Sequence, residues 1–515
     1  MDASGLFTVL GIFVAIITLV SEERRQDFFL RASKGYWLCF LTLNLLALGV
    51  LYSSVITVVT KLEPINFFWG FDDKTAVLSC VIIMSLLFIY KLLGRKLPQF
   101  QYNKWSDTSY RLLREKKYYI LSFLLEKYLD QFLNIVNKKT IYEKFYSYIF
   151  KNSRASAEEF LSTSPVHIST FIKIKRFIFK KILLVLPIEI GYKNLIYQSI
   201  EKLLKSPGFL VYLVETHPII AVKLTSSRSF LQIDEFTDSF FKNLISIKNS
   251  ILYREIRDNQ HFMYSTGYRI EPENFVLSYY FSDPTVAINA NIWKPIGDYI
   301  CKYIKEQTGK DNFYNSYCES FSYTEEPWEC PIFVGIHFFD IMVKSAIYTK
   351  TNDHMWLMYY DRFLDEILNN IDRSKNSETW QEFPLKFDYL IYCIISNCSD
   401  WVIAAKYLYK GNENIEPIEW ASYTFGTLLR KILLSKNIDF KQKIYYLQIV
   451  LKTMNELDDA KQNRLSQQIF CTIIRKYKDT APDSNISWLR YIYIQVDHVL
   501  RLSGSTFDNE IKKVP

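Results

Sequence analysis

The sequence predicts an all-α membrane protein, in which three N-terminal transmembrane helices precede a large, mostly helical cytoplasmic body. Three uncharged apolar runs lie near the start of the 515-residue chain. Glycine and proline number only 15 each, which disfavours sandwiches, barrels and glycine-rich nucleotide folds because these need many tight turns. From residue 312 onward, apolar residues recur at helical spacing.

The three apolar runs are predicted to cross a bilayer at about residues 3–21, 36–60 and 75–91. A spanning helix needs about 20 apolar residues, with roughly 17 to 25 tolerated. The third run is the shortest, and Lys74 and Lys91 at its ends can extend it by snorkelling, although a buried soluble helix is the alternative. No charged residue or histidine lies inside a run, which disfavours a transporter or pump.

The loops beside these runs predict the orientation. The first loop contains Arg24, Arg25, Arg31 and Lys34, whereas the second contains only Lys61 and Lys74. Because short cytoplasmic loops are enriched in Lys and Arg, we expect the N-terminus outside and the C-terminal body in the cytoplasm. Abundant Lys, Asn, Ile, Phe and Tyr are typical of AT-rich microbial genes, so we expect a multi-pass protein of the cell inner membrane.

Four regions are predicted along the chain: a transmembrane domain at 1–97, a basic juxtamembrane helical region at 98–205, a mixed central region at 206–311 and a helical C-terminal domain at 312–515. Residues 101–205 contain 19 basic and 9 acidic residues. Anionic lipid headgroups attract such a segment by about 1 kcal/mol per basic residue, and nucleic acid would be attracted in the same way. A solvated helix face is the plainer alternative.

Within the basic region, residues 171–187 have the pattern of a basic amphipathic helix. Helical spacing gathers four basic residues on one side, namely Lys173, Arg176, Lys180 and Lys181. We expect these side chains to lie on anionic lipid headgroups. The apolar side of the same helix can equally pack against the body, so both arrangements stay open.

The remaining body divides into a less helical part and a strongly helical part. Residues 264–312 combine alternation with X-Pro steps, which predicts a small irregular or β segment. Beyond it, helix pairs of about 40 residues predict stacked helical hairpins, which leave extended surfaces for protein partners. The candidate partner-binding residues are Trp401, Trp420 and Trp488, although tryptophan also commonly fills a core.

No signature of a metal, a cofactor or a familiar catalytic site is present. Eight cysteines lack a C-x-x-C pair, and P-loop, dinucleotide, nucleophile-elbow and zincin motifs do not occur. The densest group of potential metal ligands is Cys330, His337, Asp340, Asp353 and His354. Apolar neighbours on both sides of His337 favour a core histidine instead. We therefore expect neither cofactor nor metal, and a binding protein rather than an enzyme.

One short pattern indicates a possible enzyme. Arg254 and His261 have six residues between them, and Arg-x4–6-His resembles the active-site pair of HEPN-family ribonucleases, which are helical and sometimes membrane-linked. The resemblance implies RNA cleavage, with His261 as acid and base and Arg254 holding the phosphate. It covers eight residues, and Glu255 stands where these families usually place Asn, Asp or His. We favour a surface helix in which Arg254 and Arg257 pair with neighbouring acids, Glu255 or Asp258.

The predicted function is therefore interaction at a membrane. We expect a membrane-tethered sensor, scaffold or effector that acts by assembly, with the bilayer, a protein partner and further copies of the chain as its contacts. Membrane-tethered proteins with the composition of a mobile genomic island include bacterial anti-phage effectors, so defence is a possible role by analogy. A membrane-anchored ribonuclease and an oligomeric pore-forming effector are the alternatives.

Overall fold

The computed structural model describes residues 3–53, 72–137, 190–227, 230, 233–259, 261–309, 312–318, 321, 324–352, 355–373, 383–408, 416–474 and 487–513. The predicted membrane-surface residues Lys173, Arg176, Lys180 and Lys181 lie outside these ranges. The described chain is helical apart from one two-stranded sheet, which confirms the predicted α-helical class. It forms two compact units, Met1–Tyr212 with Ser227–Ile233 and Leu213–Ser226 with Asp234–Pro515.

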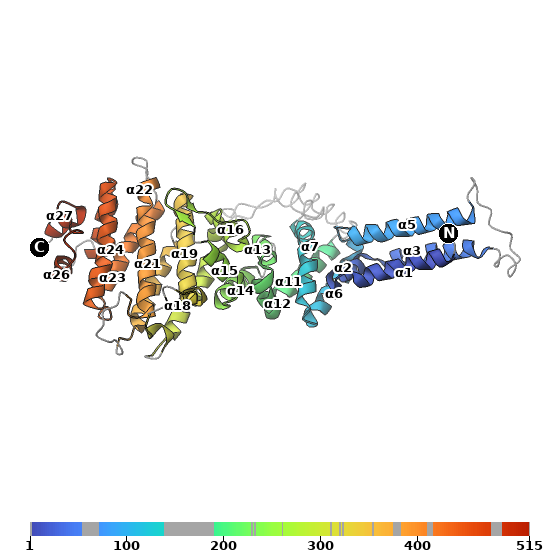
Figure 1. Cartoon of the computed structure of the whole chain (residues 1–515), viewed down its shortest axis with the longest axis horizontal. Helices are drawn as coiled ribbons and strands as arrows, with labels where there is room; N and C mark the ends of the chain where they lie inside the picture. Colours follow the sequence, from blue (N-terminus) through green and yellow to red (C-terminus); the bar gives the residue numbers. More distant parts are fainter. Residues whose placement is uncertain are drawn as a thin grey trace, which may run out of the picture. The chain divides into compact units, whose positions relative to one another are not determined.

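The N-terminal unit begins with a bundle of long helices (Figure 1). Its elements are α1 (Ala3–Leu19), α2 (Glu22–Arg31), α3 (Lys34–Leu51), α5 (Asp73–Leu93), η1 (Gln99–Gln101), α6 (Tyr102–Arg114), α7 (Tyr118–Asn137), α11 (Ile190–Leu204) and part of α12 (Pro207–Thr216). In the bundle, α5 packs on both α1 and α3. Leu6, Phe13, Ala47 and Met84 are buried between the helices, and the Phe13 ring stacks on Phe88 with 4.8 Å between centroids.

Within the described residues, three helices are long and apolar enough to cross a membrane, α3, α5 and α19 (Pro331–Tyr348), or four spans if the bent pair α12 and α13 (Pro218–Ser227) counts as one. Helices α3 and α5 overlap the second and third predicted runs, and residues 54–60 of the second run lie outside the described ranges. The first predicted run forms the 17-residue apolar helix α1. The α19 helix differs from α3 and α5 because 89% of its apolar stretch is buried inside the body, against 17% and 33% for the other two. Its apolar character is therefore that of a core helix.

The α2 helix is a short polar element between α1 and α3. Glu22 and Glu23 occupy its first turn and Arg31 its last turn, which suits the helix dipole. Asp27 and Arg31 are nevertheless buried, together with Phe28 and Leu30. The polar buried pair shows that α2 packs against other elements on more than its apolar side, and α5, α6 and α7 are those elements.

The second unit is a body of stacked helices with the bounds α13 (Pro218–Ser227), α14 (Ile233–Ser246), α15 (Ile251–Asp258), α16 (Phe275–Phe281), α17 (Pro284–Ala290), α18 (Trp293–Glu306), α19 (Pro331–Tyr348), α20 (Met358–Asn370), α21 (Lys386–Ile403), α22 (Ala405–Leu408), α23 (Glu416–Leu434), α24 (Phe440–Asp459), α25 (Asn463–Ile474), α26 (Ser487–Ile494) and α27 (Thr506–Lys513). Short 3-10 turns add η2 (Phe313–Asn315), η4 (Glu326–Glu329) and η5 (Met355–Leu357). Helices α19, α21 and α23 stand side by side in this unit (Figure 1).

Close packing holds the body together. The α19 helix contacts α15, α16, α17, α18, α21 and α23. Helices α23 and α25 approach each other closely at Gly426, where a Cβ would lie 2.6 Å from the Ile469 carbonyl oxygen. Only glycine fits at that position without displacing backbone, so Gly426 sets the spacing of the two helices.

The central segment is more helical than predicted. A hairpin of β1 (Phe262–Met263) and β2 (Gly267–Tyr268) begins it, which agrees with the expected β segment. Residues 275–281 and 284–290 then form α16 and α17, so the prediction of an irregular segment is wrong for this part. Asp283 accepts a hydrogen bond from the Thr285 amide at 3.0 Å, and Pro284 occupies the first turn of α17. A proline in that place starts a helix instead of breaking one.

Candidate functional site

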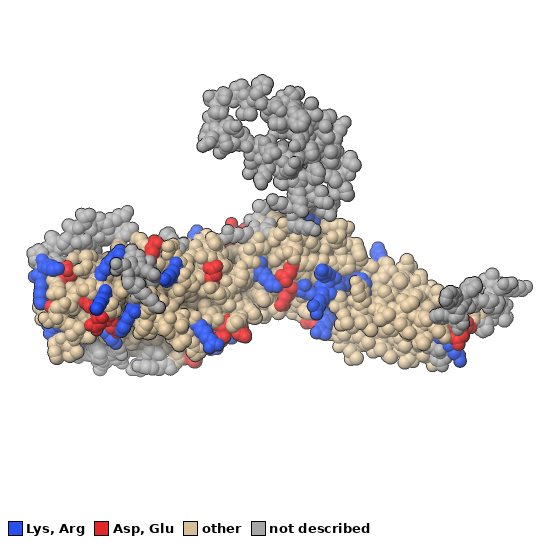
Figure 2. Space-filling model, turned by 90° about the horizontal axis from the view of Figure 1, so that it is seen from above, with Lys and Arg blue, Asp and Glu red and all other residues tan. Residues whose placement is uncertain are grey.

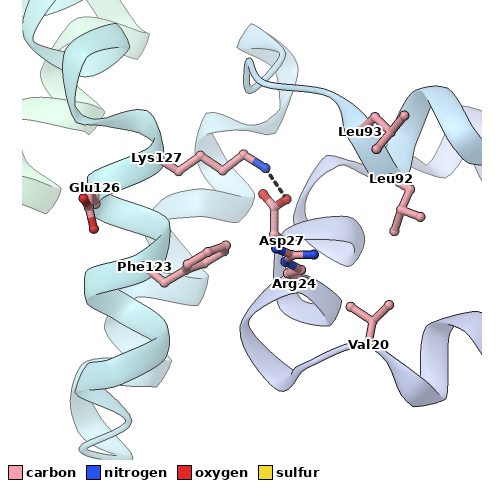
Figure 3. Close-up of a pocket in the computed structure, with 8 residues that line it drawn as sticks. All are labelled: Val20, Arg24, Asp27, Leu92, Leu93, Phe123, Glu126 and Lys127. Atoms are coloured by element: carbon pink, nitrogen blue, oxygen red, sulfur yellow. Dashed lines mark hydrogen bonds and ion pairs between the residues drawn. The ribbon is translucent and has the colours of Figure 1, made fainter.

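The candidate site is a groove at the end of the bundle, where α1 and α5 finish and α2 packs on α7. It has a volume of about 620 Å³ and is lined by Val20, Arg24, Asp27, Leu92, Leu93, Phe123, Glu126 and Lys127. All these residues belong to the N-terminal unit. Figure 3 shows Phe123 and Lys127 projecting from α7 toward Asp27, while Glu126 projects from the other side of α7.

Asp27 is the centre of a buried ionic network. Its side chain is 3% exposed, and its Oδ2 lies 2.7 Å from Arg31 Nη2 and 2.6 Å from Lys127 Nζ. The Tyr128 hydroxyl donates to the other carboxylate oxygen. Burial and the neighbouring carboxylate hold the pKa of Tyr128 far above its usual range, so the phenol stays protonated and keeps donating. Two cations and one phenol thus compensate a single buried carboxylate.

Arg31 also closes the end of α5. Its guanidinium donates to the Gly94 carbonyl and, at 3.1 Å, to the Leu92 carbonyl. The last carbonyls of a helix have no partner within the helix, so this side chain supplies one. A Cβ on Gly94 would meet the same guanidinium, which explains the glycine at this point. Arg31 therefore joins α2 to the C-terminus of α5.

Further polar contacts fix α2 on the helices beyond it. Lys117 Nζ lies 2.9 Å from Glu22 Oε1, and the Tyr119 hydroxyl donates to the same carboxylate. These two hydrogen bonds hold the pKa of Glu22 below its usual value. Lys104 donates to the Phe29 carbonyl at 2.6 Å. The bundle thus continues into α6 and α7 through a network of named side chains.

The chemistry of the groove is divided between cationic and apolar walls. Arg24 is exposed and forms no ion pair or hydrogen bond through its side chain with any residue in the described ranges. Lys127 contributes a second cation, while Val20, Leu92, Leu93 and Phe123 form the apolar wall. Such a groove can hold an anionic group beside hydrocarbon. The basic first loop that predicted the orientation contains Arg24 and Arg31, but the partner Lys127 lies 100 residues from Asp27.

Both residues of the predicted ribonuclease pair lie at the surface of the second unit. Arg254 lies on the exposed side of α15, and His261 is exposed just before β1. Of the two acids in the favoured alternative, Glu255 is not at the surface: it is 1% exposed and accepts hydrogen bonds from the Val276 and Leu277 amides. Arg257 does lie near Asp258, at 3.8 Å, and also near Glu325.

The three predicted partner-binding tryptophans have different environments. Trp401 is fully buried, and its indole N–H donates to Asp340 Oδ1 at 2.7 Å, so the expectation that it is an exposed anchor is wrong. Trp420 is 38% exposed and packs edge-on against Tyr423. Trp488 is half-buried at the start of α26.

A buried polar cluster surrounds Trp401 in the second unit. Lys344 Nζ lies 3.1 Å from Asp340 and 3.2 Å from Asp400, and it sits 4.1 Å from the centre of the Phe262 ring. The Tyr268 hydroxyl donates to Asp340 at 2.5 Å. The cluster joins the β hairpin to α19 and α21 and leaves each charge with partners, which is the arrangement of a structural network.

His337 and most cysteines of this unit pack against other side chains of the unit. His337 lies between Phe333 and Trp328, and burial lowers the pKa of its imidazole to about 4. All eight cysteines are free thiols, five of them buried in this unit: Cys301, Cys318, Cys330, Cys393 and Cys398. Burial raises the pKa of Cys301 to about 12. Within the described ranges, no group of three or more His, Cys, Asp or Glu side chains is placed to hold a metal ion.

Comparison with known proteins adds no relative to this description. No protein-family model, no curated protein and no solved structure matches the chain.

Proposed function

We propose that the protein is a membrane-anchored interaction protein, in which α1, α3 and α5 lie in the bilayer and the helical body binds protein partners beside it. The observation that carries the anchor is the outer surface of the bundle. Phe7, Leu38 and Leu86 are 60%, 63% and 62% exposed, one on each helix. Soluble proteins rarely expose a continuous apolar surface of this kind, whereas a bilayer covers it.

The distribution of charge supports the same proposal. On the face seen in Figure 2, the middle of the bundle carries no Lys, Arg, Asp or Glu, and such residues appear only near its two ends. At the end near α2 these charges include Arg24, Lys34 and Arg95. Because cytoplasmic loops are enriched in basic residues, we infer that this end and the body lie in the cytoplasm, at the inner membrane of the cell, and that the N-terminus lies outside.

The partner surface of the body is inferred from exposed apolar side chains. Phe440 on α24 and Tyr491 on α26 are 40% and 61% exposed, and their ring centroids lie 5.3 Å apart. Ile494, one turn after Tyr491, is 61% exposed. Aromatic and aliphatic side chains grouped in this way commonly anchor a protein partner. This patch, with the half-exposed Trp420, replaces Trp401 as the candidate interaction surface.

The anchor is tested by placing charge on the outer surface of α5. Ile82 and Leu86 are 49% and 62% exposed one turn apart, and an arginine at a helix centre costs about 2.5–3.5 kcal/mol on insertion. We expect Ile82→Arg with Leu86→Arg to move the full-length chain from the carbonate-resistant membrane fraction to the soluble or aggregated fraction. Leu434→Arg, at a 46% exposed position of α23, is the control that should leave fractionation unchanged.

Two outcomes contradict the proposal. If the wild-type chain is extracted by alkaline carbonate, the bundle is not inserted and its apolar surface is covered by something else. If reporters placed after Pro515 and before Met1 give an external body and an internal N-terminus, the anchor stands but the orientation is wrong.

A further inference from the structure

We propose that the groove between α2, α5 and α7 binds one anionic phospholipid, with its phosphate at Arg24 and Lys127 and an acyl chain along Leu92 and Leu93. The proposal rests on the membrane insertion proposed above and adds a ligand class to it. The groove has a volume of about 620 Å³ and lies in the N-terminal unit. It is separate from the lipid contacts that the sequence predicts at residues 171–187.

The position of the groove gives a lipid direct access. Its apolar wall includes Val20, just beyond the end of α1, and Leu92 and Leu93 at the end of α5. Leu19 and Leu93 are 85% and 71% exposed, so the groove continues directly into the uncovered apolar surface of the bundle. An acyl chain in the adjacent leaflet can therefore lie against this wall without entering water, while its headgroup stays at the level of α2.

The charges in the groove favour an anion. Arg31 and Lys127 together compensate Asp27, so the buried network carries one excess positive charge before Arg24 is counted. Arg24 adds a second cation whose guanidinium has no partner among the described residues. Glu126 is the remaining acidic lining residue, and its carboxylate lies on the side of α7 away from Asp27 (Figure 3). The excess charge thus faces the groove where a headgroup would lie.

The combination of walls identifies the ligand class. A guanidinium donates two parallel hydrogen bonds to phosphate oxygens, and an ammonium binds phosphate as a point charge. The apolar side chains of Leu92, Leu93 and Phe123 cannot hydrogen-bond to a free phosphate, but they can pack against a hydrocarbon chain. A phosphodiester attached to an acyl chain satisfies both walls, and an anionic lipid such as phosphatidylglycerol has the required charge.

The test uses the full-length protein purified from membranes and reconstituted with equal phosphatidylglycerol and phosphatidylcholine. Native mass spectrometry then measures the ratio of the two lipids retained on the protein. We expect phosphatidylglycerol to be enriched, and Arg24→Gln to reduce the enrichment roughly fivefold, the factor that corresponds to about 1 kcal/mol per basic residue at an anionic surface. Arg95→Gln is the matched control, because Arg95 is exposed near the same end of α5 but does not line the groove.

Three results overturn the site while leaving the membrane anchor intact: equal retention of both lipids by an inserted wild-type protein, an equal loss for Arg24→Gln and Arg95→Gln, or full displacement of the lipid by soluble glycerol 3-phosphate. The last would assign the groove to a free phosphate ester. Failure of the wild-type chain to stay in carbonate-washed membranes would instead overturn the anchor and the lipid site together. Equal melting temperatures of wild type and Arg24→Gln exclude misfolding as the cause of a loss.

Discussion

Trp401 combines two stabilising contacts in one residue. Its ring is fully buried against Tyr360, with 4.6 Å between centroids, and its indole N–H is satisfied by Asp340. Removing it would leave both a cavity and a carboxylate that has lost a donor. Trp420, by contrast, keeps more than a third of its surface in solvent.

This contrast predicts different results for two alanine substitutions. We expect Trp401→Ala to lower the free energy of unfolding of the body by about 3–5 kcal/mol, the usual cost of deleting a large buried aromatic side chain. Trp420→Ala should lower it by less, about 1–2 kcal/mol, since more than a third of this side chain is already in solvent. Thermal unfolding of both purified variants measures the difference. Equal destabilisation by the two substitutions would contradict the assignment of Trp420 to the surface.

Two buried titratable residues predict opposite responses to pH. The pKa of His337 is lowered from 6.5 to about 4, so the folded state excludes a proton that the unfolded state binds, and stability is lost as the pH falls through this window. Burial raises the pKa of Glu255 from 4.5 to about 7, so its contribution is present at low pH and is lost as the pH rises to about 7. Each window corresponds to roughly 3 kcal/mol.

The measurement is the melting temperature between pH 4 and pH 7 for two variants. His337→Phe should make the stability fall more steeply with rising pH than in the wild type, because the opposing histidine contribution is gone. Glu255→Gln should do the reverse and leave stability that increases with pH. Parallel pH profiles for wild type and both variants would show that neither residue titrates in its window.

At the scale of elements, α2 owes its position to one buried carboxylate. Asp27 is contacted by Arg31 from its own helix and by Lys127 and Tyr128 from α7. Removing one partner of a buried ion pair costs about 3–5 kcal/mol, because the other charges remain buried without compensation. The contact between α2 and α7 is therefore expected to be sensitive to a single substitution.

We expect Asp27→Ala to lower the melting temperature of the detergent-purified protein and to make α2 more accessible to protease. Glu126→Ala, one position before Lys127 on α7, is the control, because its exposed side chain has no ionic partner among the described residues. An unchanged melting temperature for Asp27→Ala would mean that apolar packing of Phe28 and Leu30 alone holds α2 in place.

The apolar elements could be predicted from sequence, but the polar contacts between them could not. Runs without charge identified α1, α3 and α5, because apolar side chains alone define such helices. The α17 helix was missed because Pro284 has the same signature at a helix start as at a break. The groove was missed because Asp27 and Lys127 are brought together only by the packing of α2 on α7.

At the scale of the whole molecule, the two compact units differ in how much of their apolar helix surface is buried. The first leaves its bundle helices uncovered, whereas the second buries its most apolar helix, α19, almost completely. Hydropathy alone does not separate these two cases, because it records composition and not what packs against a helix. The difference predicts that only the first unit requires a membrane.

We therefore expect residues 213–515, expressed without the preceding chain, to remain in the supernatant after ultracentrifugation and to show a helical circular dichroism spectrum. The reason is that burial of α19 removes its apolar surface from solvent. Expression of 1–212 under the same conditions is the comparison and should sediment with membranes. Recovery of 213–515 in carbonate-washed membranes would instead identify α19 as a spanning helix.

The five buried cysteines of the second unit can serve as native probes of local unfolding in that unit. A thiol reacts with an alkylating reagent as the thiolate, which burial suppresses at Cys301, Cys330, Cys393 and Cys398. Each of these thiols reacts only when the helices around it open locally. Its alkylation rate therefore reports either the rate constant or the equilibrium constant of that opening. Because the thiols lie on α18, before α19 and along α21, their order of modification ranks these layers by local stability without any introduced label.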